Sequence, residues 1–311
     1  MRNSPLPLMK LSKTDYRGGA ALRLATRAWE LVVTTGVGPR VVDFRSPAGR
    51  AGNLFFQFPP NEARAHGMLL RGGHRLWHSP EDVVRTYQPD DRPLAVTSLR
   101  RGLTLTQPTE EKTGLQKAMT FEALGEHTVR VTHTLANRGL WPVECAPWAL
   151  TMMRGGGYGV LPLLPKGSHA AGDLLPSYAI VPWTYTDLAL RVWEPHRDFL
   201  GINTRRAKAA QKLGITNYPG WSAYWIDGTT FVKAARVVRG ARYPDLGCCW
   251  ETFTNGKMIE FETLGPVANL APGRRAGHVE WWTVFEGLPR PDTDSAFGKL
   301  AAAAKSWLAK L

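Results

Sequence analysis

Several features that place proteins in narrow classes are missing from this chain of 311 residues. No apolar run reaches the roughly 18 residues of a membrane span, so no transmembrane helix is expected. The segment Met1–Lys10 is short and polar and lacks the apolar stretch of a secretory signal, which favours a cytoplasmic protein. Only three cysteines occur, Cys145, Cys248 and Cys249, without zinc-finger spacing, and we expect them to be buried or free thiols.

Motifs of nucleotide-binding and hydrolytic proteins are missing as well. There is no Walker loop, and the triplet Gly155–Gly157 does not lie between a strand and a capped helix. Neither a nucleophile elbow nor a cysteine–histidine signature is present. We expect neither a bound cofactor nor a metal ion.

The net charge of +13 comes from basic residues scattered over the chain, in short doublets such as Arg100-Arg101. Nucleic-acid-binding proteins concentrate such charge in a stripe or a recognisable module. We therefore expect no nucleic-acid partner and no membrane partner. A diffuse basic surface is the simpler interpretation, and an anionic small ligand, such as a uronate or a sugar phosphate, is the alternative.

Short extended runs separated by turn residues dominate the sequence and predict an all-β, antiparallel protein. Asp227-Gly228 and Asn255-Gly256 lie between such runs and predict two hairpins. The predicted strands are Trp29–Thr34, Arg40–Arg45, Ala95–Leu99, Leu103–Gln107, Gln116–Ala123, Thr128–Leu135, Val143–Met152, Ser222–Ile226, Thr229–Ala235, Cys249–Thr254, Met258–Leu264 and Gly277–Phe285.

One helix is expected, at about residues 294–310, capped by Asp294 or Ser295 and docked on the surface of the β body. The Gly- and Pro-rich stretch from Arg154 to Pro182 contains enough apolar residues to predict a long ordered loop over the body. No linker or repeat divides the chain, so residues 1–311 are expected to form a single domain of stacked large antiparallel sheets.

The strand Met258–Leu264 carries two carboxylates at i and i+2, which places Glu260 and Glu262 on one face and Ile259 and Phe261 on the other. Two like charges on one face repel each other and do not belong in an apolar core without partners. Their face therefore looks into water or lines a polar cavity in which one carboxylate has a raised pKa. The second alternative describes a candidate active site.

A second polar cluster surrounds Gly72-Gly73, where the backbone can turn sharply. It contains Arg71, Arg75, Trp77, two histidines and two acids. Arginine suits carboxylates, phosphates or vicinal hydroxyls. His74 and His78 share a face in either a strand or a helix, so a metal pair with Glu81 is one alternative, and a polar segment at a sheet edge is another.

Aromatic residues next to polar ones form a third group. Trp148 and the neighbouring pair Trp183 and Tyr185 could stack on the C–H faces of a sugar, although core packing is the commoner role of such residues. Asp245 follows a proline and is first a turn residue and second a ligand group. His278 and Glu280 alternate onto one face, where a cross-strand ion pair is favoured over an acid–base pair.

Three local motifs resemble the galactose mutarotase-like superfamily of the aldose 1-epimerase type. Glu262-Thr263-Leu264-Gly265-Pro266 with Leu270-Ala271-Pro272-Gly273 looks like the late strand that carries the family's catalytic glutamate and its following turn. Leu70-Arg71-Gly72-Gly73 is similar to the entry whose arginine faces the sugar. The resemblance implies a β-supersandwich with a C-terminal surface helix and a carbohydrate ligand.

The resemblance also implies chemistry at the anomeric carbon, in which a base takes the O1 proton while an acid protonates the ring oxygen. Glu262 matches the base and Arg71 the sugar-binding arginine. Where the family has its histidine acid, this chain has Ala146-Pro147-Trp148, so the acid role falls to His74 or His78. A 1-epimerase is expected, with Arg75, Trp77, Trp148, Trp183, Tyr185, Asp245 and Glu260 in the binding site. A non-catalytic sugar-binding protein, and a lyase or hydrolase on the same scaffold, are the alternatives.

Overall fold

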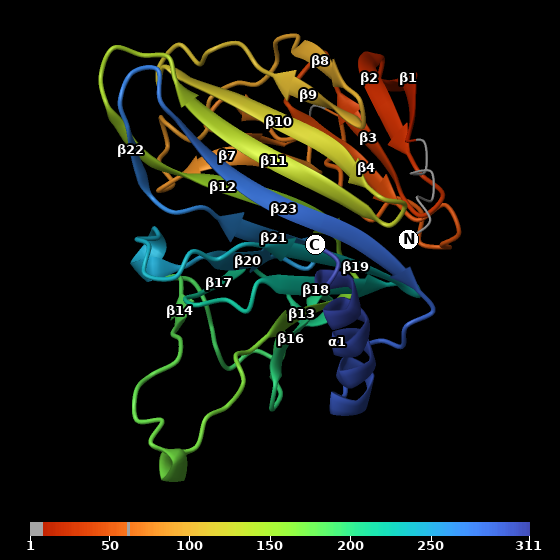
Figure 1. Cartoon of the computed structure of the whole chain (residues 1–311), viewed down its shortest axis with the longest axis vertical. Helices are drawn as coiled ribbons and strands as arrows, with labels where there is room; N and C mark the ends of the chain where they lie inside the picture. The colour runs from red at the N-terminus through yellow and green to blue at the C-terminus, as the bar shows by residue number, and fades with distance from the viewer. Residues whose placement is uncertain (1–8, 61–62) are drawn as a thin grey trace, which may run out of the picture.

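Two large antiparallel sheets, of 11 and 10 strands, make up the body of the protein (Figure 1). The computed structural model describes residues 9–60 and 63–311. In order across the first sheet, the strands are β1 (Lys10–Tyr16), β2 (Gly19–Ala25), β3 (Glu30–Thr34), β4 (Arg40–Arg45), β7 (His74–Ser79), β12 (Val143–Arg154), β21 (Met258–Leu264), β20 (Trp250–Thr254), β17 (Gln211–Ile215) and β14 (Ile180–Pro182), with β22 (Ala268–Leu270) paired to β12.

The second sheet packs against the first. Its strands, in order, are β15 (Trp193–Pro195), β16 (Phe199–Asn203), β13 (Tyr158–Pro162), β18 (Trp221–Ile226), β19 (Thr229–Ala235), β23 (Arg275–Glu286), β11 (Thr128–Asn137), β10 (Leu115–Leu124), β9 (Gly102–Thr106) and β8 (Ala95–Leu99). The short strands β5 (Arg64–Ala65) and β6 (Met68–Leu69) form a hairpin of their own. Every strand predicted from the sequence is present, and the predicted all-β sandwich of large antiparallel sheets is confirmed.

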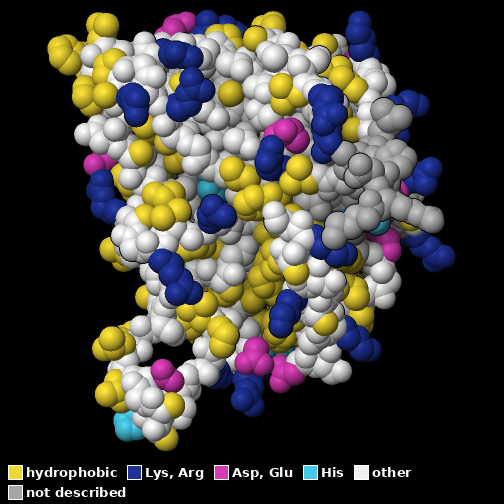
Figure 2. All heavy atoms as spheres, in the orientation of Figure 1, with side chains coloured by type: hydrophobic (Ala, Val, Ile, Leu, Met, Phe, Trp, Pro, Cys, Tyr) yellow, Lys and Arg dark blue, Asp and Glu magenta, His cyan; other side chains and the backbone are white. Residues whose placement is uncertain are grey.

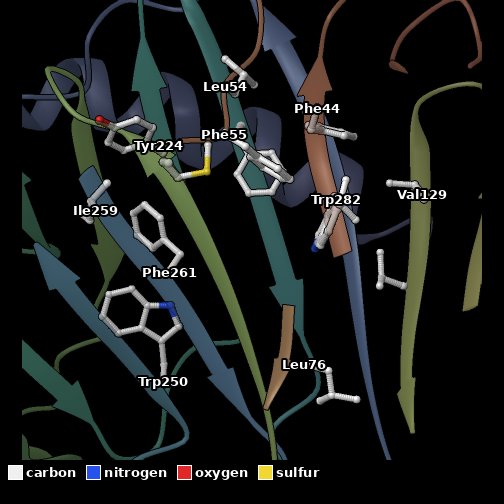
Figure 3. Packing of buried hydrophobic residues seen from close by; sticks show 14 of the residues in the cluster. Phe44, Leu54, Phe55, Leu76, Val129, Tyr224, Trp250, Ile259, Phe261 and Trp282 are labelled. Carbon is white, nitrogen blue, oxygen red and sulfur yellow. The ribbon is translucent and has the colours of Figure 1, made fainter. Parts of the chain in front are cut away.

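The main core lies between the two sheets because alternate residues of both sheets turn inward. Figure 3 shows Phe261 and Trp250 of the first sheet side by side, with ring centroids 5.7 Å apart. Trp282 of the second sheet meets Phe44 and Phe55 edge-on. The three cysteines are buried and free, as predicted.

The C-terminal helix α1 (Asp294–Leu308) packs on the outer face of the second sheet (Figure 1). Its buried stripe includes Leu300, Ala304 and Trp307. The predicted helix is confirmed, but the predicted cap is not. Thr293 is the N-cap, and its hydroxyl accepts a hydrogen bond from the backbone N–H of Ala296 at 3.2 Å.

The stretch from Arg154 to Pro182 differs from its prediction. It contributes β13 to the second sheet, and then the chain from Leu163 to Ala179 extends away from the body instead of lying over it (Figure 1). Leu174 and Leu175 near its tip are 68% and 87% exposed. It contains the short 3-10 helix η1 (His169–Ala171), and two further 3-10 turns, η2 (Thr204–Arg206) and η3 (Asp245–Gly247), follow in the chain.

The surface in Figure 2 carries lysine and arginine side chains dispersed among apolar and neutral ones, without one basic stripe on this face. Within residues 9–60 and 63–311, no helix combines the length and the apolar character that crossing a membrane requires.

Candidate functional site

Five neighbouring strands of the first sheet place polar side chains on its outer face. Cross-strand pairing sets Trp77 of β7 beside Trp148 of β12, and Leu150 of β12 beside Glu262 of β21. Glu262 is in turn the direct partner of Glu251 on β20. The inward-facing residues between them fill the core, so the outer side chains form one continuous patch.

A cavity of about 350 Å³ opens over this patch, a size at the lower end of those that hold small ligands. Aromatic rings and a few charged groups surround it. The charged lining residues are Arg75, Glu81, Lys212 and Glu260, and the aromatic ones are Phe58, Trp77, Tyr87, Trp148, Tyr185 and Phe253. Five of the predicted site residues therefore come together here, namely Arg75, Trp77, Trp148, Tyr185 and Glu260.

Arg75 and Glu260 form an ion pair on the cavity wall. Arg75 Nη2 donates to Glu260 Oε1 at 3.1 Å, and the guanidinium lies 4.0 Å from the ring centroid of Trp77. Burial raises the pKa of Glu260 to about 7, and the charge of Arg75 opposes that rise. A carboxyl group with such a pKa exchanges protons readily near neutral pH.

Glu262 lies beside Glu260 on the same strand face but has no exposed surface. Its Oε2 accepts a hydrogen bond from Trp148 Nε1 at 2.8 Å and another from Lys212 Nζ at 3.1 Å. Lys212 also forms an ion pair with Glu251 at 2.8 Å. Burial raises the pKa of Glu251 well above its usual range, with the charge of Glu262 adding to the rise. The three side chains form a buried charge cluster beneath the cavity.

Two aromatic residues enclose Lys212. Its Nζ lies 4.8 Å from the ring centroid of Trp148 and 4.7 Å from that of Trp183, distances at which a cation is attracted to a ring face. Tyr185, two residues beyond Trp183, lines the cavity, and burial raises its pKa to about 12. The phenol is therefore a hydrogen-bond donor at neutral pH.

Arg71 and Asp245, both expected in the binding site, lie outside the cavity lining. Arg71 Nη1 donates to Asp90 Oδ1 at 2.8 Å, and this partly buried aspartate also pairs with Arg40. Asp245 accepts a hydrogen bond from Ser79 Oγ at 3.2 Å, which ties the η3 turn to the end of β7. Arg71 and Asp245 thus support the strands around the site.

The expectation that His74 or His78 faces the sugar is wrong because both lie on the inner face of β7, where neither has exposed surface. Side chains alternate along a strand, so Arg75 and Trp77 face the cavity and the two histidines face the core. Burial lowers the pKa of both histidines well below the usual value. The alternative of a metal pair with Glu81 fails for the same reason, and β7 is an interior strand, not a sheet edge.

His74 belongs instead to a polar network between the sheets. His74 Nε2 lies 2.7 Å from His133 Nε2, and His133 Nδ1 donates to the backbone carbonyl of His278 at 3.1 Å. Glu280 forms an ion pair with Lys233 of the neighbouring strand at 2.7 Å, which confirms the predicted cross-strand ion pair. The atoms of His74, His133 and Glu280 that could coordinate a metal ion lie within 4.8 Å of one another. The negative charge of the Glu280 carboxylate is, however, already compensated by the ammonium group of Lys233.

The two glycines before β7 are required by the close approach of neighbouring backbone. Gly73 has a φ of +72°, and a Cβ added there would come within 2.0 Å of the carbonyl oxygen of Val41. Gly72 has a φ of +84°, and its Cβ would come within 2.2 Å of the carbonyl oxygen of Phe56. The glycine pair therefore lets the chain enter β7 in the register that points Arg75 outward.

Sequence reasoning missed Glu251 and Lys212. Asn255-Gly256 correctly predicts a hairpin, but a two-residue loop there would pair Glu251 with Glu260. The observed register instead pairs Thr254 with Ile259 and Glu251 with Glu262. Lys212 is the one charged residue of β17, whose five residues are all buried, and a single lysine in a short strand is a weak signal for a buried ion pair.

No family model matches the chain, and no curated protein sequence does. Among solved structures, the Slr1438 protein of Synechocystis superposes with a TM-score of 0.56 and 11% identity, over 92% of this chain and 100% of the other. A galactose mutarotase-like protein from Clostridium acetobutylicum gives 0.56 and 10%, over 90% and 99%. One from Lactobacillus casei gives 0.55 and 9%, over 89% and 100%. The chain thus has the galactose mutarotase-like fold.

Proposed function

We propose that this protein binds a sugar in the cavity over the first sheet and interconverts the sugar's anomers. The observation that carries the proposal is a carboxyl group, Glu260, with a pKa raised to about 7 on the wall of an aromatic-lined cavity. Aromatic faces suit the C–H faces of a pyranose, and a group titrating near neutral pH suits proton transfer at O1. The structural likeness to galactose mutarotase-like proteins supports the same class of ligand.

In this proposal Glu260, not Glu262, accepts the O1 proton. The carboxylate of Glu260 lines the cavity, whereas that of Glu262 is covered by Trp148 and held by Lys212. Glu262 and Glu251 then act through Lys212, whose ammonium group they keep charged and in place.

Ring opening needs a proton at the ring oxygen for each proton removed from O1. The cavity offers two donors for it, the hydroxyl of Tyr185 and the ammonium group of Lys212. Closure of the ring on the other face of the carbonyl returns the proton to the donor, and Glu260 gives its proton back to O1. The protein is therefore unchanged after each anomer exchange.

Anomer exchange is measurable by saturation-transfer NMR or polarimetry on glucose, galactose and glucuronate. Wild-type protein is expected to accelerate exchange for at least one sugar, with a rate that rises with pH around a midpoint near 7, as for a base that must be ionised. Glu260→Gln should lower the rate by about a hundredfold or more, because a general base contributes roughly that much.

Glu122→Gln is the matched control, because Glu122 pairs with Arg130 on the partly exposed second sheet, away from the cavity. Its rate should equal that of wild type. Unchanged exchange for every sugar with wild-type protein, or full activity in Glu260→Gln, would contradict the proposed function.

Sugar binding without turnover is the second candidate, and the placement of His74 and His78 in the core favours it, since no histidine is among the described residues that line the cavity. In that case tryptophan fluorescence should report binding that weakens on Trp148→Phe, while the exchange rate stays at that of the free sugar.

A further inference from the structure

A buried lysine of the second sheet, Lys233, reaches across the core to the back of the candidate site. Its side chain is 1% exposed and lies on β19. Nζ donates to Thr151 Oγ1 at 2.9 Å and to the carbonyl oxygen of Phe261 at 2.9 Å, and it forms an ion pair with Glu280 at 2.7 Å. All three protons of the ammonium group therefore have acceptors.

The two acceptors on the first sheet, Thr151 and Phe261, lie between residues of the site along their strands. Phe261 is the residue between Glu260 and Glu262 on β21, and Figure 3 shows its ring pointing into the core. Thr151 lies between Leu150 and Met152 on β12, both of which line the cavity. Because side chains alternate in a strand, Lys233 holds two adjacent strands directly behind the outward-facing carboxylates.

Packing alone does not account for a lysine at this place. Well-packed apolar residues stabilise a core at least as well as a buried ion pair does, because taking both charges out of water carries a large desolvation cost. An ammonium group, unlike an apolar side chain, forms directional hydrogen bonds, and these fix the positions of the two strands relative to each other.

We propose that Lys233 is a positioning residue that holds β12 and β21 so that Glu260 is correctly placed toward the cavity. The inference rests on the proposed function and extends it to a residue that does not touch the sugar. Without the hydrogen bonds from Lys233, β12 and β21 should move relative to each other and water should enter behind the Glu260 carboxylate. The base would then be misplaced, which lowers turnover more than binding.

The test compares two double variants, Lys233→Met/Glu280→Gln and Lys117→Met/Glu110→Gln. Lys117 and Glu110 form an equally buried ion pair, 2.6 Å apart, away from the site. Each glutamate also accepts a hydrogen bond from a threonine hydroxyl, Glu280 from Thr263 and Glu110 from Thr113. Each double change avoids an unpaired buried charge.

Only the Lys233 pair should lower kcat, by about tenfold with KM changed less than about twofold. Equal kcat values in the two variants, or a rise in KM alone, would overturn the proposal. If the Lys233 double variant does not fold, Thr151→Val replaces it. This near-isosteric change removes the hydroxyl that accepts from Lys233 and that also lies 2.9 Å from His74 Nδ1. Unchanged kcat in this variant also overturns the proposal.

A readout independent of turnover separates this inference from the proposed function. The carboxyl carbon of Glu260, assigned with Glu260→Gln, can be titrated by ¹³C NMR, and its midpoint in wild type should lie near the pKa of about 7. The Lys233 variant should move that midpoint toward the ordinary value of glutamate by about half a unit or more, because water then reaches the carboxylate. If the Glu260 titration midpoint is the same in both double variants, the positioning role of Lys233 is wrong, whatever the sugar assays show.

Discussion

At the scale of single residues, burial distinguishes two glutamates that leave the same face of β21. Glu260 is 7% exposed and Glu262 is 0% exposed, although they leave the same strand face two positions apart. Trp148 and Lys212 cover Glu262, whereas the cavity reaches Glu260. The base in the proposed function is therefore Glu260, the neighbour of Glu262, to which the resemblance in the sequence points.

Lys212 compensates two buried carboxylates at once, so its removal should be costly. Lys212→Met is expected to lower the free energy of unfolding by about 3–5 kcal/mol, because Glu251 and Glu262 then remain buried without a cation. Urea denaturation followed by tryptophan fluorescence measures the loss. Adding Glu262→Gln to the lysine variant should restore part of the stability, and a double variant no more stable than the single one would contradict this account.

At the scale of elements, the alternation of β7 decides which residues reach the site. His74, Leu76 and His78 turn inward, while Arg75 and Trp77 turn outward. A shift of one residue would exchange the two sets, since the side-chain period of a strand is two. The glycine pair at the entry of β7 sets this register because only glycine fits between the neighbouring backbones.

Two glycine substitutions separate backbone strain from steric exclusion. Gly73→Ala should lower the free energy of unfolding by on the order of 3 kcal/mol, because a Cβ would clash with Val41 as well as adopt a left-handed conformation. Gly52 has a similar φ of +65° with no atom within 4 Å of its Cβ, so Gly52→Ala should cost only about 1 kcal/mol. Chemical denaturation compares them, and equal losses would show that the close approach at Gly73 is unimportant.

At the scale of the whole molecule, the core holds titratable groups that make stability depend on pH. Burial lowers the pKa of His133 and of His278 to about 3, and it lowers those of His74 and His78 as well. Burial acts in the opposite direction on carboxyl groups, raising the pKa of Glu260 to about 7 and also that of Glu251.

The free energy of unfolding is expected to fall as the pH is lowered below about 6.5, most steeply below about 4.5. Below the ordinary histidine pKa the unfolded chain binds protons that the folded chain refuses, which costs about 1.4 kcal/mol per pH unit for each histidine. Between about 4.5 and 7 the folded carboxyl of Glu260, whose pKa is about 7, holds a proton that the unfolded chain lacks, which offsets part of this loss, and the raised pKa of Glu251 acts in the same direction. Urea midpoints at pH 7, 5.5 and 4 measure the trend, and a constant midpoint would rule out neutral histidines in the core.

The sequence by itself determined many of the strands, the C-terminal helix and the placement of Glu260 and Glu262 on one face, because these follow from local periodicity; β7 and β17, which also carry site residues, were not among the predicted strands. It could not say which face of a strand meets the other sheet, because a period of two is the same seen from either side. It also could not bring Lys212 to Glu251 and Glu262, since β17 pairs with β20 across a large separation in the chain and the register of the β20–β21 hairpin differs from that of a two-residue loop. Only the packing of the two sheets decided that the histidines lie in the core and that Arg75 and Glu260 meet at the cavity.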